Sequence, residues 1–267
     1  MSDDNKKDDD KKKKDEKLAE GTLISHLLEL RDRLLRAVVA IIIAFLPAAY
    51  YHNQLFERLA KPLIMSLRPG SSLIATTVTG AFLVPYKVAI LVAIFVAMPW
   101  VLYQIWAFVA PGLYRHEKRF AVPLLVSAIV LFYAGAFFAY FFILPVAFHV
   151  LLGLGPESVK AMPDINNTVD FLVRVFLAFG TAFEIPVVVV LLTLTGLVPI
   201  EKLVHARGYV VIGIFVIAAI LTPPDPFSML MMAVPMWLLY EGGLLMARLM
   251  NRQRDAAKAA QERSGDG

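Results

Sequence analysis

The stretch FLVRVFLAFGTAFEIPVVVVLLTL (residues 171–194) contains only two ionisable side chains, Arg174 and Glu184. A helix needs about 20 mainly apolar residues to cross a hydrocarbon core about 30 Å thick, and this stretch is long enough to do so. The stretch therefore predicts a transmembrane helix.

Five further apolar stretches accompany it. Residues 34–51, 84–107 and 122–149 are also long enough to span a bilayer. Because the stretch 122–149 is longer than needed, we expect it to tilt, to kink at Pro145 or to continue along the interface. These stretches predict an all-α membrane protein.

The last two apolar stretches, residues 209–221 and 227–240, are shorter. As helices they would rise only about 20 Å at 1.5 Å per residue. The residues leave two interpretations open: a re-entrant hairpin, or two short spans that thin the bilayer locally. The intervening TPPDP (residues 222–226) cannot be helical, because its prolines lack donors and restrict the residues before them.

Composition agrees with a membrane protein and divides the chain into three parts. Hydrophobic residues make up 58% and charged residues 18%, against about 45–50% and about 25% in soluble domains. Residues 1–20 are blocks of Asp and Lys with almost no apolar side chain, so we expect disorder there. Residues 21–250 should form a six-helix transmembrane domain, and residues 251–267 a flexible tail.

The distribution of Lys and Arg predicts the orientation. Of these 26 residues, 20 lie in the two terminal segments and the loops on their side of the membrane, and four lie in the alternate loops. The positive-inside rule then places both termini in the cytoplasm. The expected location is the inner (cytoplasmic) membrane.

No enzyme signature is present. Metalloprotease, P-loop, serine-elbow and dinucleotide-binding motifs are all missing. The absence of cysteine excludes disulfides, zinc–thiolate sites and cysteine nucleophiles. We therefore expect no enzymatic activity, no cofactor, no metal site and no nucleic-acid partner.

Glu184 is a candidate for function inside the membrane. It lies 14 residues beyond Asp170, about 21 Å along a helix. A charge at such depth costs at least about 2.5–3.5 kcal/mol, so the side chain should face protein or a wet cavity. A functional acid and a structural carboxyl bonded to a neighbouring helix are equally compatible with the sequence. Arg174 is explained by pairing with Asp170 four residues earlier.

Two acids stand out on the side assigned to the cytoplasm. Glu29 lies in SHLLELRDR (residues 25–33) and Glu117 in YRHEKR (residues 114–119). For Glu29, helical spacing by itself favours a local pair with Arg33, which would contribute about 0–1 kcal/mol.

Four motifs resemble the TatC family, the polytopic subunit of the twin-arginine protein translocase. They occur in order between about residues 23 and 246. They are HLLELRDRLL (26–35), YQIWAFVAPGLYRHE (103–117), AFGTAFEIP (178–186) and LTPPD (221–225).

The resemblance implies a fold and a role. Family members have six spans in a concave, glove-like wall, with cytoplasmic termini and two short final helices, which favours two short spans over a hairpin. They bind twin-arginine signal peptides of folded precursors and use the proton-motive force. Their partners are the single-span subunits TatA and TatB, membrane lipid and, as we expect here, further copies of the chain.

The resemblance also implies which residues act. Glu29 and Glu117 are similar to the acids that receive the paired arginines, and Glu184 to an intramembrane acid facing the cavity. Positions lining the signal-peptide surface are Arg31, Phe108, Pro111 and Leu113, and positions in the outer loops are Pro62 and Asp225. Two departures from the family pattern are Met229, where Gln is common, and Arg174.

Two other functional classes remain as alternatives. A proton-coupled small-solute permease would use Glu184 as its proton relay. An intramembrane protease would need Asp225 and Glu184 as its acids, and these should lie at different depths.

Overall fold

The computed structural model describes residues 3–66, 72–109, 121–153, 162–222 and 226–265, and for residues 3–24, 62–63, 66, 121, 152–153 and 253–265 it describes the backbone only. Within these ranges the chain is helical and contains no strand, apart from one isolated bridge between Ile74 and Asp164. The elements are α1 (Asp3–Tyr50), α2 (His52–Ser66), α3 (Val78–Val109), α4 (Ala121–Phe138), the π-helical turn η3 (Ala139–Ile143), α5 (Leu144–Gly153), α6 (Ile165–Ala182), α7 (Ile185–Leu194), α8 (Ile200–His205), α9 (Arg207–Leu221) and α10 (Pro226–Gly265).

Five helical segments of the described chain are long and apolar enough to cross a membrane. They are Ser25–Tyr50, Val78–Val109, Val122–Leu151, Ile165–Leu194 and Pro226–Arg252. A sixth apolar helix, Arg207–Leu221, is shorter. Each of the six predicted stretches lies in one of these segments, except that the first ends one residue beyond Tyr50, which confirms the prediction of an all-α membrane fold.

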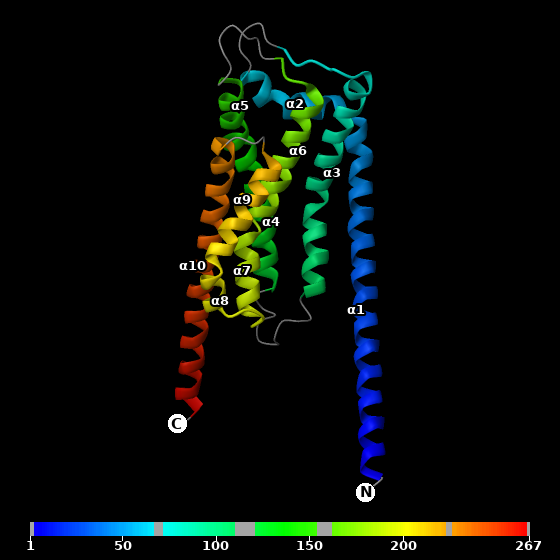
Figure 1. Cartoon of the computed structure of the whole chain (residues 1–267), viewed down its shortest axis with the longest axis vertical. Helices are drawn as coiled ribbons and strands as arrows, with labels where there is room; N and C mark the ends of the chain where they lie inside the picture. Colours follow the sequence, from blue (N-terminus) through cyan, green and yellow to red (C-terminus); the bar gives the residue numbers. More distant parts are fainter. Residues whose placement is uncertain (1–2, 67–71, 110–120, 154–161, 223–225, 266–267) are drawn as a thin grey trace.

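The long helices stand side by side as a wall (Figure 1). Helix α1 forms one edge and packs on α3, while α9 and α10 form the other edge. Both termini lie at one end of the bundle, which we call the inner end, and α2 lies across the opposite, outer end (Figure 1). The two termini are therefore on the same side, and their cytoplasmic location stays a prediction.

Prolines set the two breaks within the spans. The helix of residues 122–151 changes to a π-helical turn just before Pro145, where a kink was one of the three expected adjustments. The fourth span is interrupted at Phe183 and Glu184, just before Pro186 at the start of α7. Proline causes both breaks because it has no backbone N–H and its ring clashes with the carbonyl four residues earlier.

Helices α4 and α6 pack closely against each other. Phe179 is fully buried, and the ring of Phe132 lies 4.9 Å from that of Phe95 on α3. Gly135 makes the close approach possible, because a Cβ there would lie 2.5 Å from the Phe179 carbonyl oxygen. This crossing fixes the height of α6 in the wall.

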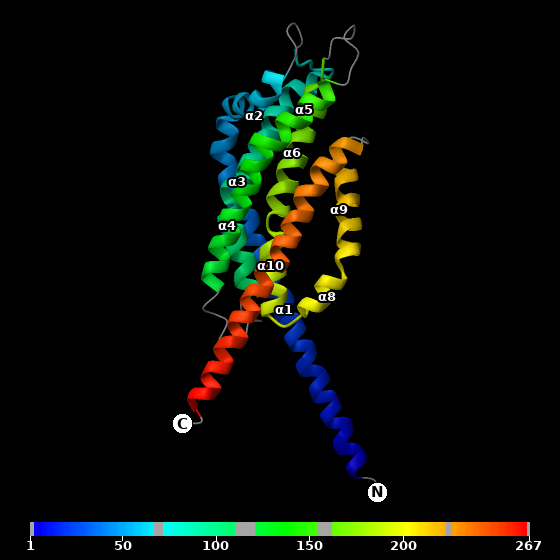
Figure 2. The ribbon, with the colours of Figure 1, turned by 90° about the vertical axis from the view of Figure 1, so that its left-hand side faces the viewer.

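The final helix differs from the prediction of two short helices. Helix α9 is short, but α10 continues far beyond the apolar stretch that ends at Tyr240. It continues because Glu241 forms an ion pair with Arg207 of α9, with 2.6 Å between Arg207 Nη2 and Glu241 Oε2, and because apolar residues follow. The ends of α9 and α10 that face the outer end stop short of the level reached by α5 and α6 (Figures 1 and 2).

The backbone of the charged N-terminal segment is helical, and its disorder stays a prediction. Helix α1 begins at Asp3, so its backbone is helical through residues predicted to be disordered. Lys, Glu and Ala favour helix, and a helix that already exists extends more easily than a new one forms. In α10, likewise, the backbone is helical through the expected flexible tail to Gly265. The division of the chain at residues 20 and 250 stays a prediction.

Candidate functional site

The inner end of α1 carries one of the two predicted recognition acids. Glu29 accepts two hydrogen bonds from Arg33, with 2.6 Å between Arg33 Nη2 and Glu29 Oε1 and 3.0 Å from Arg33 Nε. This is the local pair that helical spacing favours. The Glu29 side chain is nevertheless 39% exposed, so an exposed pair of this kind contributes about 0–1 kcal/mol and is readily exchanged for another partner.

Arg31 lies two residues further along α1. Its Nη2 contacts Asp32 Oδ1 at 2.9 Å, and both side chains are more than half exposed. This end of α1 therefore presents acidic and basic groups to solvent in alternation.

A ring contact connects this segment to the end of α3. The ring of His26 stacks on that of Phe108 with centroids 4.3 Å apart and planes 24° apart. Phe108 is one of the predicted site residues, and the chain runs from it towards Glu117. The contact brings together the two segments whose motifs carry the predicted acids.

Several predicted site residues lie outside the described residues: Pro111, Leu113, Glu117 and Asp225. Pro62 belongs to the backbone of α2 at the outer end, and its side chain is outside the described set.

Glu184 lies in the break between α6 and α7. Its carbonyl accepts the backbone N–H of Val188 at 2.9 Å, while its carboxyl has no hydrogen-bond partner among the described residues and its Oε1 is buried. The structural alternative requires a bond from a neighbouring helix, and no described residue makes it. Gln104 on α3 is a second buried side chain whose Oε1 has no partner within the described chain.

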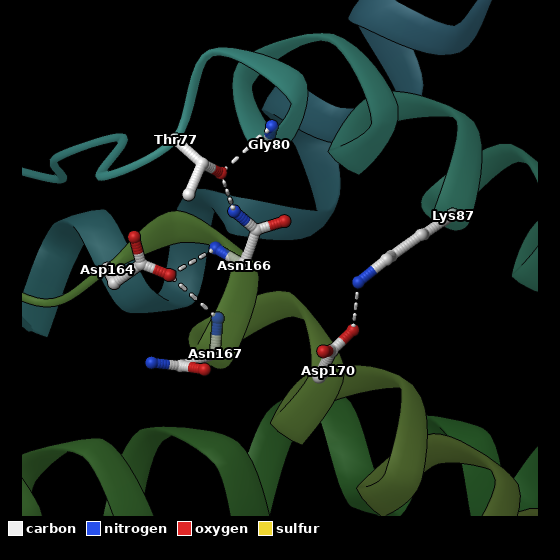
Figure 3. A network of polar contacts seen from close by, with 7 residues as sticks. All are labelled: Thr77, Gly80, Lys87, Asp164, Asn166, Asn167 and Asp170. Atoms are coloured by element: carbon white, nitrogen blue, oxygen red, sulfur yellow. Dashed lines mark hydrogen bonds and ion pairs between the residues drawn. The ribbon is translucent and has the colours of Figure 1, made fainter.

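The outer ends of α3 and α6 contain a polar network that sequence reasoning missed (Figure 3). Asp164 caps α6 by accepting the N–H groups of Asn166 and Asn167 at 2.9 and 3.1 Å. It also accepts the hydroxyl and N–H of Thr76 at 2.6 and 3.1 Å. The hydroxyl of Thr76, followed by these backbone donors, holds the pKa of Asp164 below its ordinary value.

The position of Asp170, further along α6, corrects the predicted pairing of Arg174. Its Oδ1 lies 2.6 Å from Nζ of Lys87 on α3 (Figure 3). A partner on another helix replaces the local one because α3 and α6 pack together here. Arg174 is exposed and takes part in no ion pair of the described chain. The cap formed by Asp164 could have been predicted, because an Asp shortly before an apolar stretch is typical of a helix N-terminus. The contact of Asp170 with Lys87 could not, because it depends on how α3 and α6 pack.

The described residues hold no group of three or more His, Cys, Asp or Glu side chains that could bind a metal ion.

Comparison with known proteins places the chain among membrane translocase components. The family model described as "Sec-independent protein translocase protein (TatC)" matches residues 25–235. The chain belongs to the TatC family. The matched range includes the first five apolar segments and the first part of α10.

The relatives of this TatC-family chain agree along most of their length. The Sec-independent protein translocase protein TatC of Azotobacter chroococcum is 46% identical over 236 residues, which cover 88% of this chain and 92% of the relative. That of Escherichia coli K12 is 45% identical over 226 residues, covering 85% and 88%. A crystal structure of the twin-arginine translocase receptor TatC superposes with a TM-score of 0.77 at 39% identity, covering 84% of this chain and 98% of the other.

Proposed function

We propose that this chain is the core receptor subunit of the twin-arginine translocase. It binds the twin-arginine signal peptides of folded precursors and takes part in their export, driven by the proton-motive force. The observation that supports the proposal is the stacking of His26 on Phe108, which joins the segment of Glu29 to the end of α3. In the sequence, Glu117 follows nine residues after Phe108.

Carboxylates suit a pair of arginines for a geometric reason. A guanidinium presents a planar fork of donors that matches a carboxylate and stays charged at accessible pH. Glu29 is half exposed and held by a side chain of its own helix, so an incoming arginine can replace Arg33. Glu117 is the second acceptor, and Arg31, Phe108, Pro111 and Leu113 line the surface around the two acids.

The apolar part of the signal peptide supplies the remaining affinity. A charge-assisted hydrogen bond contributes about 1.5–3 kcal/mol, which selects a ligand but does not anchor it. Exposed apolar side chains on the described helices offer a lipid-embedded surface for the rest, such as Ile105 on α3 and Leu34 on α1. The paired arginines thus select the precursor, and the apolar segment of its signal peptide retains it.

Photo-cross-linking tests the receptor role. A twin-arginine precursor should cross-link to the wild-type chain in membranes, and Glu117→Ala or Glu117→Lys should abolish the product while the protein stays in the membrane. Glu57→Ala is the matched control, because Glu57 is an exposed acid on α2 at the outer end. Undiminished cross-linking in the Glu117 variants would refute the assignment.

The orientation and the partners belong to the same proposal. Both termini lie in the cytoplasm, the protein resides in the inner membrane, and it works with TatA and TatB, with further copies of itself and without enzymatic activity or a cofactor. The strong Lys and Arg excess at the inner end supports this orientation. Cysteine-accessibility labelling at Ser25 and at Asn53 tests it, since the two positions should react from opposite sides.

The shortness of α9 suggests where cargo crosses. Its 15 residues rise about 22 Å, less than the about 30 Å of hydrocarbon, so lipid must thin beside it. We expect export to fall when α9 is lengthened by one helical turn near Val216. Full export by the lengthened chain, at equal abundance, would contradict this step.

Glu184 supports one alternative function, a proton-coupled small-solute permease. The supporting observation is its buried carboxyl oxygen, which has no partner in the described chain. Uptake by purified protein in liposomes, driven by a pH gradient and lost in Glu184→Gln, would favour the permease over the receptor.

A further inference from the structure

A groove lies beneath α2, between α1 and α3, and it has no part in the proposed receptor role. Its volume is about 510 Å³, within the range of about 300–1,000 Å³ typical of small-molecule sites. Its apolar walls come from α1, α2 and α3 and comprise Ala44, Pro47, Ala48, Leu55, Val92 and Val96.

The groove exists because α1 carries small side chains at this height. Ala48 packs directly on Ala89 and Ala93 of α3, which lets the two helices approach closely. One turn away, Ala44 has too short a side chain to fill the space in front of Val92. The result is an apolar slot bordered by two helices and closed above by α2.

The upper rim of the groove is polar. Tyr51, Gln54 and Arg58 line it, and all three side chains are exposed. Tyrosine is enriched at the level of lipid headgroups, which places the rim at the membrane surface. None of the four ion pairs found among the described residues includes Arg58, so its guanidinium is available to an external anion.

The rim is held in place by the rest of the fold. The Tyr140 hydroxyl of η3 donates to the backbone carbonyl of Arg58 at 3.0 Å. At the start of α2 the ring of His52 stacks on Tyr86 of α3, with centroids 4.5 Å apart and planes 11° apart. The guanidinium is thus presented from a fixed backbone above a preformed slot.

We propose that this groove binds one phospholipid, with its phosphate on Arg58 and an acyl chain between α1 and α3. An anionic head joined to an apolar tail is the chemistry that matches a cation above an apolar slot. Arginine binds phosphate oxygens with its fork of donors, and at this level its charge stays in the headgroup region while its stem covers apolar surface. The bound lipid belongs to the leaflet at the outer end and fills the space that Ala44 leaves.

Native mass spectrometry of the full-length chain tests the proposal, with dioleoyl phosphatidylglycerol titrated into detergent-solubilised protein. The wild-type chain should retain one lipid at low lipid excess, and Arg58→Gln should weaken that binding about tenfold, as expected for losing a charge-assisted contact. Val96→Trp should also weaken it by obstructing the slot from its exposed side.

Lys61→Gln is the matched control, because Lys61 is an exposed cation on α2 outside the groove lining. Its lipid binding should equal that of the wild-type chain. Equal retention by Arg58→Gln and wild type would overturn the proposal, and so would an equal loss in Lys61→Gln, which would indicate general attraction of anionic lipid. If Val96→Trp changes the oligomeric mass without changing lipid retention, the groove is a protein interface and the proposal is wrong.

Discussion

The acidic side chains at the two ends of the span formed by α6 and α7 differ in whether the protein supplies them with partners. At the outer end, Asp164 accepts four hydrogen bonds and Asp170 is paired with Lys87 across to α3. Towards the inner end, Glu184 lies in the proline-induced break, and its carboxyl has no partner in the described chain. The protein satisfies the carboxyls of Asp164 and Asp170, which therefore stabilise the fold, and we expect the unpaired carboxyl of Glu184 to serve function instead.

The largest effect should come from the crossing that fixes α6 between these two ends. In Gly135→Ala, the new methyl group would meet the Phe179 carbonyl at 2.5 Å, and backbone cannot move aside cheaply. We expect a loss of about 3 kcal/mol in the free energy of unfolding, measured by denaturation in detergent. Gly213→Ala on α9 is the control, because nothing lies within 4 Å of its added Cβ. Equal stability of the two variants would mean that the α4–α6 crossing is not tightly packed.

A smaller loss is expected from the outer ion pair. Asp170→Asn leaves Lys87 without its counter-charge, and each side chain is 39% exposed. Because solvent screens a pair this exposed, the cost should be about 1 kcal/mol in the same unfolding assay. The double variant Lys87→Met with Asp170→Leu should recover most of the loss, and no recovery would argue against pairing as the cause.

The cap of α6 should show itself in the pH dependence of stability. Because the pKa of Asp164 is lower in the folded protein than its ordinary value of 3.8, its ionised form stabilises the fold above that value. This contribution is lost as the pH falls through the lower, folded pKa. Wild type should therefore have a higher unfolding temperature than Asp164→Asn at neutral pH, and the gap should close in acid. A constant gap from neutral to acid pH would exclude this linkage.

The smallest effect on stability is expected at Glu184. Replacing it by Gln removes no hydrogen bond or ion pair found in the described chain, so the free energy of unfolding should change by less than about 0.5 kcal/mol. Export of a twin-arginine precursor should nevertheless fall, measured as mature protein outside the membrane per unit of chain. A loss of stability as large as that of Asp170→Asn would mean that Glu184 stabilises the fold, which would contradict this prediction.

The sequence predicts much of the fold, because membrane spans follow from apolar length alone. Residues 122–149 and 171–194 lie inside observed spans, and the prolines at 145 and 186 mark the observed breaks. The end of α10 was not predicted, because the charged residue Glu241 indicates the end of an apolar stretch in the sequence. Only the structure shows that Glu241 is paired with Arg207. A pair between residues far apart in the chain is not encoded in local spacing.

Some features of the candidate site could likewise be predicted from the sequence, and others could not. The acids Glu29 and Glu184 stand out in the sequence as charges within apolar or basic surroundings. The partner of Asp170 did not, because Arg174 at helical spacing was the plausible local choice and Lys87 lies 83 residues away. The contact of His26 with Phe108 was also missed, since nothing in either motif indicates that the two rings meet.

The most direct test of the receptor role is a double-mutant cycle between the chain and its ligand. Binding of a signal peptide to the purified wild-type chain and to Glu29→Gln with Glu117→Gln would be measured for the paired-arginine peptide and for its paired-lysine version. If the acids receive the arginines, the two changes should be non-additive, with a coupling energy of about 1.5–3 kcal/mol. Additive losses, with a coupling energy near zero, would contradict the account.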